Sequence, residues 1–158
     1  MPNGMLWPIK ASLLAYIESL DDGAADVTEP ASRRDEAFWF PHVGADDAAG
    51  PGPGVVLAFS GAVRLTGHWG MMQFEFRDPE VRFGEVGAVL RLRESGRPDR
   101  FTSVADLRLE DSVEGDDGSS VTTLHATLTG EGTFLFGGQY PADTLLGPVR
   151  IEWSPRHG

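Results

Sequence analysis

The 158-residue chain contains no cysteine, which excludes disulfides, thiolate metal sites and thiol nucleophiles. Without cysteine, the redox compartment cannot be read from the sequence. Basic residues are also scarce, since 13 Lys and Arg stand against 24 Asp and Glu and give a net charge of −11. Phosphate-rich surfaces are bound by Lys and Arg, so this balance argues against general binding of nucleic acids or acidic membranes.

No apolar run in the sequence is long enough to cross a membrane. The first twenty residues do not form a secretory signal, because they have no basic start and Lys10, Ser12 and Glu18 interrupt their apolar character. We therefore expect a cytoplasmic protein. A secreted or cell-surface domain whose leader had been trimmed would show the same features.

The common enzyme motifs are missing as well: the sequence holds no HExxH, Walker loop, GxSxG or GxGxxG. His42, His125 and His157 lie scattered, without the spacing of metal ligands. No nucleophile stands beside a plausible base. We therefore do not expect an enzyme.

The residues that are present predict one mainly β domain over residues 1–158, with 41% of the residues apolar. From Val55 onward, short apolar runs alternate with clusters of Gly, Pro, Asp and Ser. The predicted strands are VVLAF, AVRLTGHW, MMQFEF, EVRFG, AVLRLR, VADLRLE, VTTLHATLT, GTFLF and PVRIEW. This pattern is typical of an antiparallel β-sandwich or barrel.

The segment before these strands predicts one N-terminal α-helix. Pro8 suits its first position, and Asp21-Asp22-Gly23 ends it. One face of the helix carries Ile9, Leu13, Tyr16, Ile17 and Leu20. After the helix we expect a loop over Ala24–Glu36, the aromatic run Phe38-Trp39-Phe40, and a flexible connector over Gly44–Gly54.

The stretch LTGHWGMM places His68 and Trp69 between two glycines. Strand alternation sets His68 on the row that faces away from the core. Glycine inside a strand often marks the close approach of a ligand or of another backbone, so the stretch predicts that something docks there. A surface histidine without a ligand is the alternative.

The chain has only two tyrosines. Tyr16 lies on the apolar face of the predicted helix, so on its own it is expected to be a core tyrosine with its hydroxyl satisfied at the edge. Tyr140 lies in the turn-rich segment GGQYP and is expected to cover one end of the sandwich.

Four segments of the chain resemble the HtaA-type haem-binding domain of bacterial haem-uptake proteins. Leu6–Ile17 is similar to the opening W-x-[IV]-K-x-S-F-x-x-Y-I of that family, and Phe59–His68 is similar to its F-x-G-x-V-x-F-x-x-H segment. Arg77–Val81 resembles the [ND]-P-x-[IV] that follows, and Phe136–Val149 resembles the closing F-x-x-[FY]-Y-x-x-G-[ST]-x-L-x-P-[VL]. The segments occur in the family's order and span nearly the whole chain.

The resemblance implies a function and a set of site residues. In the family, a helix tyrosine ligates the haem iron, a strand histidine hydrogen-bonds that tyrosine, and a late tyrosine packs against the porphyrin. By position these residues are Tyr16, His68 and Tyr140. The implied cofactor is ferric haem b, held without catalysis for transfer, storage or buffering and exchanged with haem donor or acceptor proteins.

A porphyrin also needs a slot with apolar walls and partners for its two propionates. The candidate wall residues are Trp69, Met71, Phe38, Trp39 and Tyr140, each of which could equally belong to the core or its edge. The candidate propionate partners are Arg33, Arg34 and Arg64, although a solvated charge is the favoured interpretation of each.

Two alternatives remain open. The domain could be a β-sandwich interaction module that has lost haem binding, or an enzyme that consumes haem. A one-to-one visible spectrum on adding hemin to the pure protein distinguishes haem binding from the first alternative, and haem breakdown with a reductant and oxygen would reveal the second.

Overall fold

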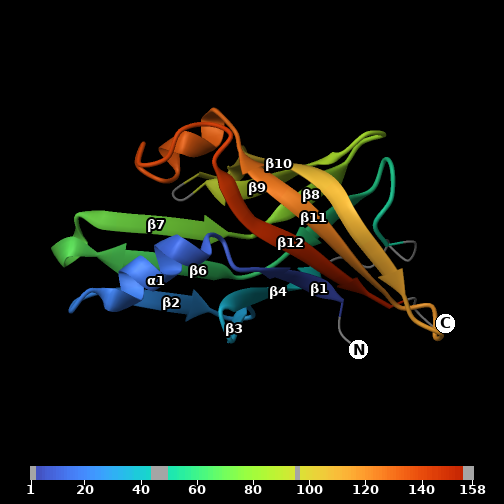
Figure 1. Cartoon of the computed structure of the whole chain (residues 1–158), viewed down its shortest axis with the longest axis horizontal. Helices are drawn as coiled ribbons and strands as arrows, with labels where there is room; N and C mark the ends of the chain where they lie inside the picture. The colour runs from blue at the N-terminus through green and yellow to red at the C-terminus, as the bar shows by residue number, and fades with distance from the viewer. Residues whose placement is uncertain (1–2, 44–49, 95–96, 155–158) are drawn as a thin grey trace.

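A computed structural model describes residues 3–43, 50–94 and 97–154. Within them, antiparallel strands close into a barrel in the order β1-β12-β11-β10-β9-β8-β5-β4, because β1 pairs with both β12 and β4 (Figure 1). The barrel strands are β1 (Gly4–Trp7), β4 (Ala37–Val43), β5 (Val56–Phe59), β8 (Glu80–Phe83), β9 (Ala88–Glu94), β10 (Arg97–Glu114), β11 (Ser120–Leu128) and β12 (Leu145–Trp153). The prediction of a mainly β, barrel-like domain with one N-terminal helix is confirmed.

A second, three-stranded sheet carries the helix. Its order is β2 (Ala24–Thr28), β6 (Ala62–Gly67) and β7 (Met72–Arg77), all antiparallel. The helix α1 (Ala11–Ser19) packs along β2 and β6, as Figure 1 shows. The short strand β3 (Ser32–Arg34) extends the large sheet beside β4.

Alternating side chains explain how the small sheet covers the core. In β7, Met72, Phe74 and Phe76 are buried, whereas Gln73 and Arg77 are exposed. Burying each phenylalanine stabilises the fold by about 1.5–3 kcal/mol. The sheet is therefore fixed with one face inward and the other in solvent.

The helix begins three residues later than predicted, at Ala11 instead of Pro8. The indole of Trp7 donates to the carbonyl of Gly147 at 2.9 Å, and the amide of Gly147 donates to the carbonyl of Ile9 at 2.8 Å. These bonds tie the segment to β12, and Ile9 has a φ of 68° that no right-handed helix contains. The helix therefore begins only after these hydrogen-bonded residues.

Three other local predictions are wrong. Residues 24–36 do not form a simple loop but contain β2 and β3, and the segment GTFLF is not a strand but overlaps the 3₁₀ helix η2 (Glu131–Phe134). Strand β1 was not predicted at all. Of the predicted connector, residues 44–49 lie outside the described residues, and 50–54 contain no strand.

In the parts of the chain just described, no helix combines the length and the apolar character that a membrane span requires.

Candidate functional site

The structure brings Tyr16 and His68 into direct contact. Tyr16 Oη lies 2.6 Å from His68 Nε2, and the two ring centroids are 5.7 Å apart at an angle of 46°. Either group can donate this hydrogen bond, depending on the imidazole tautomer. Tyr16 is 44% exposed and His68 is exposed, so the expectation that Tyr16 is a core residue is wrong.

Helix packing explains the outward position of Tyr16. The buried residues of α1 are Leu13, Leu14 and Ile17, which face the small sheet. Tyr16 lies beside this stripe, with Ala15 exposed before it. The helix thus holds the phenol at the border between core and solvent.

His68 does not lie in a strand, although the sequence predicted one through Trp69. Strand β6 ends at Gly67, the last residue to pair with β7, and the next three residues form the 3₁₀ turn η1 (His68–Gly70). The amide of Met71 closes this turn by donating to the carbonyl of His68 at 3.1 Å. His68 is therefore at the tip of the β6–β7 hairpin and points toward α1.

Gly67 and Gly70 allow the backbone conformation and packing of this hairpin. A Cβ on Gly67 would lie 2.7 Å from Leu20 Cδ1, so glycine lets the end of β6 approach the helix. Gly70 has a φ of 86°, which glycine adopts readily. The predicted close approach at Gly67 is therefore made by the helix.

Two large apolar side chains flank His68 in solvent. Trp69 is 86% exposed and Met71 is 91% exposed. On η2, Phe134 is 85% exposed as well; it was not predicted as a site residue because its segment was read as a strand. Apolar side chains mark a binding surface where they form a contiguous exposed patch, and Trp69 and Met71 are carried by the same short segment as His68.

Tyr140 lies close to Lys10, at the start of the helix. Its ring is 5.6 Å from the ring of Phe136, and the ammonium of Lys10 lies 5.2 Å from its centroid. Burial raises the pKa of Tyr140 above its ordinary value, which keeps its phenol neutral. Lys10 immediately precedes α1, so Tyr140 contacts the segment that leads into the helix carrying Tyr16.

Two of the candidate wall residues are part of the core. Phe38 and Trp39 are buried on β4, and the guanidinium of Arg34 stacks on Trp39 at 3.9 Å. The interpretation of Phe38 and Trp39 as walls of an open slot is wrong, since Phe38 packs in the hydrophobic core and the ring of Trp39 is covered by Arg34.

The arginines near the helix already have partners. Arg33 donates to both carboxylate oxygens of Glu18, at 2.9 and 3.1 Å, and this hydrogen-bonded contact lowers the pKa of Glu18. Arg34 lies 3.8 Å from Glu152. Arg64 is exposed on the solvent face of β6.

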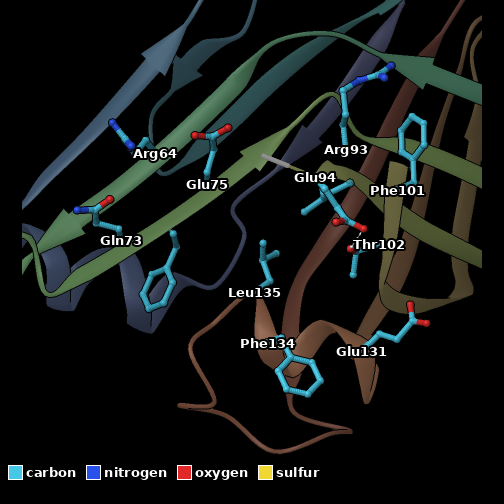
Figure 2. Close-up of a pocket in the computed structure, with 12 residues that line it drawn as sticks. Arg64, Gln73, Glu75, Arg93, Glu94, Phe101, Thr102, Glu131, Phe134 and Leu135 are labelled. Atoms are coloured by element: carbon cyan, nitrogen blue, oxygen red, sulfur yellow. Dashed lines mark hydrogen bonds between the residues drawn. The ribbon is translucent and has the colours of Figure 1, made fainter. Parts of the chain in front are cut away.

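A separate pocket of about 580 Å³ lies along the free edge of β7, between this strand and β9, β10 and η2 (Figure 2). Phe74 and Leu92 are buried at its floor. Its rim carries Arg64, Glu75, Arg93, Glu94 and Glu131. We call it the β7 pocket.

The charged groups of the β7 pocket are largely paired within the protein. Arg93 binds Asp78 at 3.1 Å, Glu75 accepts from Arg77 at 2.8 Å, and Glu94 accepts from the hydroxyl of Thr102 at 3.3 Å. No group of three or more His, Asp or Glu side chains able to hold a metal occurs among residues 3–43, 50–94 and 97–154.

Solved structures of similar fold come from Corynebacterium glutamicum. The C-terminal domain of HtaA is 20% identical, with a TM-score of 0.78 over 98% of this chain and 96% of that domain. The N-terminal domain of HtaA is 19% identical, with a TM-score of 0.75 over 99% and 98%. The haem-binding protein HtaB is 17% identical, with a TM-score of 0.68 over 97% and 92%.

At these identities the structures establish a shared fold. A search of curated proteins gives no match. The family model described as Htaa, however, matches residues 3–152, which is nearly the whole chain and includes Tyr16, His68 and Tyr140. The chain therefore belongs to the HtaA family.

Proposed function

We propose that this chain binds ferric haem, with the phenolate oxygen of Tyr16 as the iron ligand and His68 as its hydrogen-bond partner. The observation that carries the proposal is the 2.6 Å contact between Tyr16 Oη and His68 Nε2 at an exposed position. Family membership and the name of HtaB, a haem-binding protein, support the same ligand.

The donor set fits ferric haem. A phenolate is a hard oxygen ligand of the kind that holds haem iron in other tyrosine-ligated proteins. A free phenol has a pKa near about 10, so the phenolate form needs stabilisation at neutral pH. His68 can donate through Nε2–H to the phenolate oxygen, and a hydrogen bond to the charged form favours that form. Bound iron supplies further Lewis acidity at the same oxygen.

The surroundings of this pair also suit a porphyrin. Trp69 and Met71 stand almost fully exposed on the turn that carries His68, where they would lose their contact with water on binding an apolar ring. Tyr140 offers an aromatic face beside Phe136. Lys10, which has no ion pair among the described residues, is the cation that we assign to a propionate.

The proposed role is non-catalytic: transfer, storage or buffering of haem, with exchange between haem donor and acceptor proteins. Its support is the position of Tyr16 at the surface, where a ligand can be reached without opening the core. A cytoplasmic location stays a prediction from the sequence.

Titration of the purified protein with hemin tests the proposal. We expect a saturable one-to-one visible spectrum with the absorption of a ferric tyrosinate haem. The control is hemin titrated into the same buffer without protein, where the absorbance shows no saturation at one equivalent. No spectral change on adding hemin would contradict the proposal and favour an interaction module.

A further inference from the structure

The turn that carries His68 has an unfavourable backbone. Three consecutive residues have positive φ values: His68 at 50°, Trp69 at 57° and Gly70 at 86°. Glycine tolerates this region, but residues with a Cβ adopt it only when their surroundings hold them there. Hydrogen bonds within the hairpin hold part of this turn, from the Met71 amide to the His68 carbonyl and from the Gln73 side chain to the Gly70 carbonyl, and contacts from outside the hairpin add to them.

Asp22 supplies such a contact from the turn that follows α1. Its carboxylate Oδ2 accepts a hydrogen bond from the backbone N–H of Trp69. A charged acceptor makes a stronger hydrogen bond to an amide than a neutral one. The bond joins two segments that are 47 residues apart in the sequence.

The turn that presents Asp22 is itself firmly placed. The amide of Gly23 donates to the carbonyl of Leu20 at 3.2 Å, and a Cβ on Gly23 would lie 1.7 Å from the carbonyl oxygen of Ile17. Only glycine fits at this position, so the turn lies close against the end of the helix. Asp22 is consequently a fixed point from which the hairpin tip can be held.

The hairpin tip is thus attached to the helix side at two points. Tyr16 contacts the ring of His68, and Asp22 binds the next backbone amide, of Trp69. Fixing the backbone after His68 restricts where its imidazole can lie, because the side chain direction follows from φ and ψ. The 2.6 Å contact to Tyr16 depends on that direction.

We propose that Asp22 is a positioning residue of this site: it holds the His68–Trp69 turn in the conformation in which His68 Nε2 reaches Tyr16 Oη. The effect on haem rests on the proposed function above. The effect on the Tyr16–His68 contact does not, and is measured in the protein without haem.

Three variants separate position from charge. Asp22→Glu keeps the charge but moves the carboxylate by one methylene, whereas Asp22→Asn keeps the acceptor in place and removes the charge. Asp21→Ala is the matched control, because Asp21 is the exposed neighbour and makes no hydrogen bond or ion pair among the described residues.

The first measurement is the rate of haem transfer to an excess of apomyoglobin. We expect Asp22→Glu to release haem about tenfold faster than the parent, the scale of one lost charge-assisted hydrogen bond. Asp22→Asn should stay closer to the parent, and Asp21→Ala should match it. Equal rates of haem release for Asp22→Glu and the parent would overturn the proposal, as would an increase in Asp21→Ala as large as that in Asp22→Glu.

A double-mutant cycle shows whether Asp22 acts through His68. If it does, adding Asp22→Glu to His68→Ala produces no further increase in the rate of haem release, since the imidazole to be positioned is gone. Fully additive effects would mean that Asp22 only stabilises the loop, and would overturn the positioning role.

The last measurement uses the protein without haem. In NMR spectra we expect Asp22→Glu to shift the ring resonances of His68 and the amide of Trp69, and Asp21→Ala to leave both unchanged. Unchanged His68 ring resonances in Asp22→Glu would overturn the proposal. A parent protein that binds no hemin would refute the proposed function alone, and these spectra would still decide the role of Asp22.

Discussion

Around Tyr16 and His68, two large apolar side chains stand in solvent, Trp69 and Met71. The β7 pocket has one such side chain, Phe134, and otherwise buries Phe74 and Leu92 beneath a charged rim. The charges of that rim are mostly satisfied by neighbours, as with Glu75 and Arg77. Apolar groups left in water are costly to keep unless a ligand covers them, and paired charges need no ligand. The difference supports the proposed haem binding at the first surface.

The largest effect expected from this comparison is on the iron ligand. Tyr16→Phe keeps the ring and removes the hydroxyl oxygen that lies 2.6 Å from His68 Nε2. Haem affinity should therefore fall by about a hundredfold or more, the scale of a lost bond to a metal and its charge-assisted partner. Hemin titrations of Tyr16→Phe and Tyr140→Phe give the measurement and its control. An equal loss in both variants would show that neither tyrosine is the specific ligand.

The second prediction contrasts exposed with buried apolar groups. Phe74→Ala in the pocket floor should lower the free energy of unfolding by about 3–5 kcal/mol, because it opens a cavity in the core. Trp69→Ala should leave that free energy within about 0.5 kcal/mol of the parent and weaken haem binding instead. Chemical denaturation gives the free energy of unfolding of both variants, and hemin titration gives their haem affinity. A Trp69→Ala variant that is destabilised but binds haem as tightly as the parent would contradict the prediction.

The third prediction concerns the histidine. His68→Ala leaves Tyr16 in place but removes the donor to its phenolate, so we expect roughly a tenfold loss of haem affinity, smaller than for Tyr16→Phe. The loss should be larger at neutral than at alkaline pH, where the phenolate forms without help. Hemin affinities measured across this range for the parent and the variant test both points.

The fourth prediction expects the smallest change in haem affinity and tests the assignment of propionate partners. Lys10→Ala should weaken haem binding several-fold, within the range of a surface ion pair of about 0.2–1 kcal/mol, whereas Arg33→Ala should not weaken it, since Arg33 is engaged by Glu18. A haem-affinity loss in Arg33→Ala equal to that in Lys10→Ala would refute the assignment.

The Glu18–Arg33 pair should affect the stability of the protein at acidic pH. Because the hydrogen bond from Arg33 lowers the pKa of Glu18 in the folded state, the pair stabilises the protein above the ordinary carboxyl pKa of 4.5. That contribution is lost as the pH falls through the lowered pKa. Glu18→Gln should remove this small contribution to the pH dependence of stability at acidic pH. Thermal unfolding temperatures of the parent and the variant, measured as a function of pH, test this.

Strands such as β7 and β11 could be predicted because they alternate buried and exposed side chains. Only residues 104–110 of β10 were predicted, because Val104 and Ala105 are both buried and residues 108–114 are all exposed, so the full strand does not alternate. Strands β2 and β3 could not, since both carry exposed polar residues and owe their conformation to pairing with β6 and β4. The segment GTFLF has strand-like composition, but the hydroxyl of Thr129 accepts from the amide of Gly132 at 2.9 Å and starts a 3₁₀ turn.

The candidate site was only partly accessible from the sequence. Helical periodicity placed Tyr16 on the apolar face, and strand alternation ran through His68, so neither pattern predicted their contact; the resemblance to the HtaA family did. The positive φ values at His68 and Trp69 have no signal in the sequence apart from the glycine that follows them. The contact of Asp22 with Trp69 joins distant segments and could come only from the fold.

Resonance Raman spectroscopy of the hemin-loaded protein, excited in the phenolate-to-iron charge-transfer band, tests the central claim most directly. The account predicts tyrosinate ring vibrations that are present in the parent and in Tyr140→Phe and are lost in Tyr16→Phe. Tyrosinate vibrations that persist in Tyr16→Phe, or that are missing from the loaded parent, would contradict it.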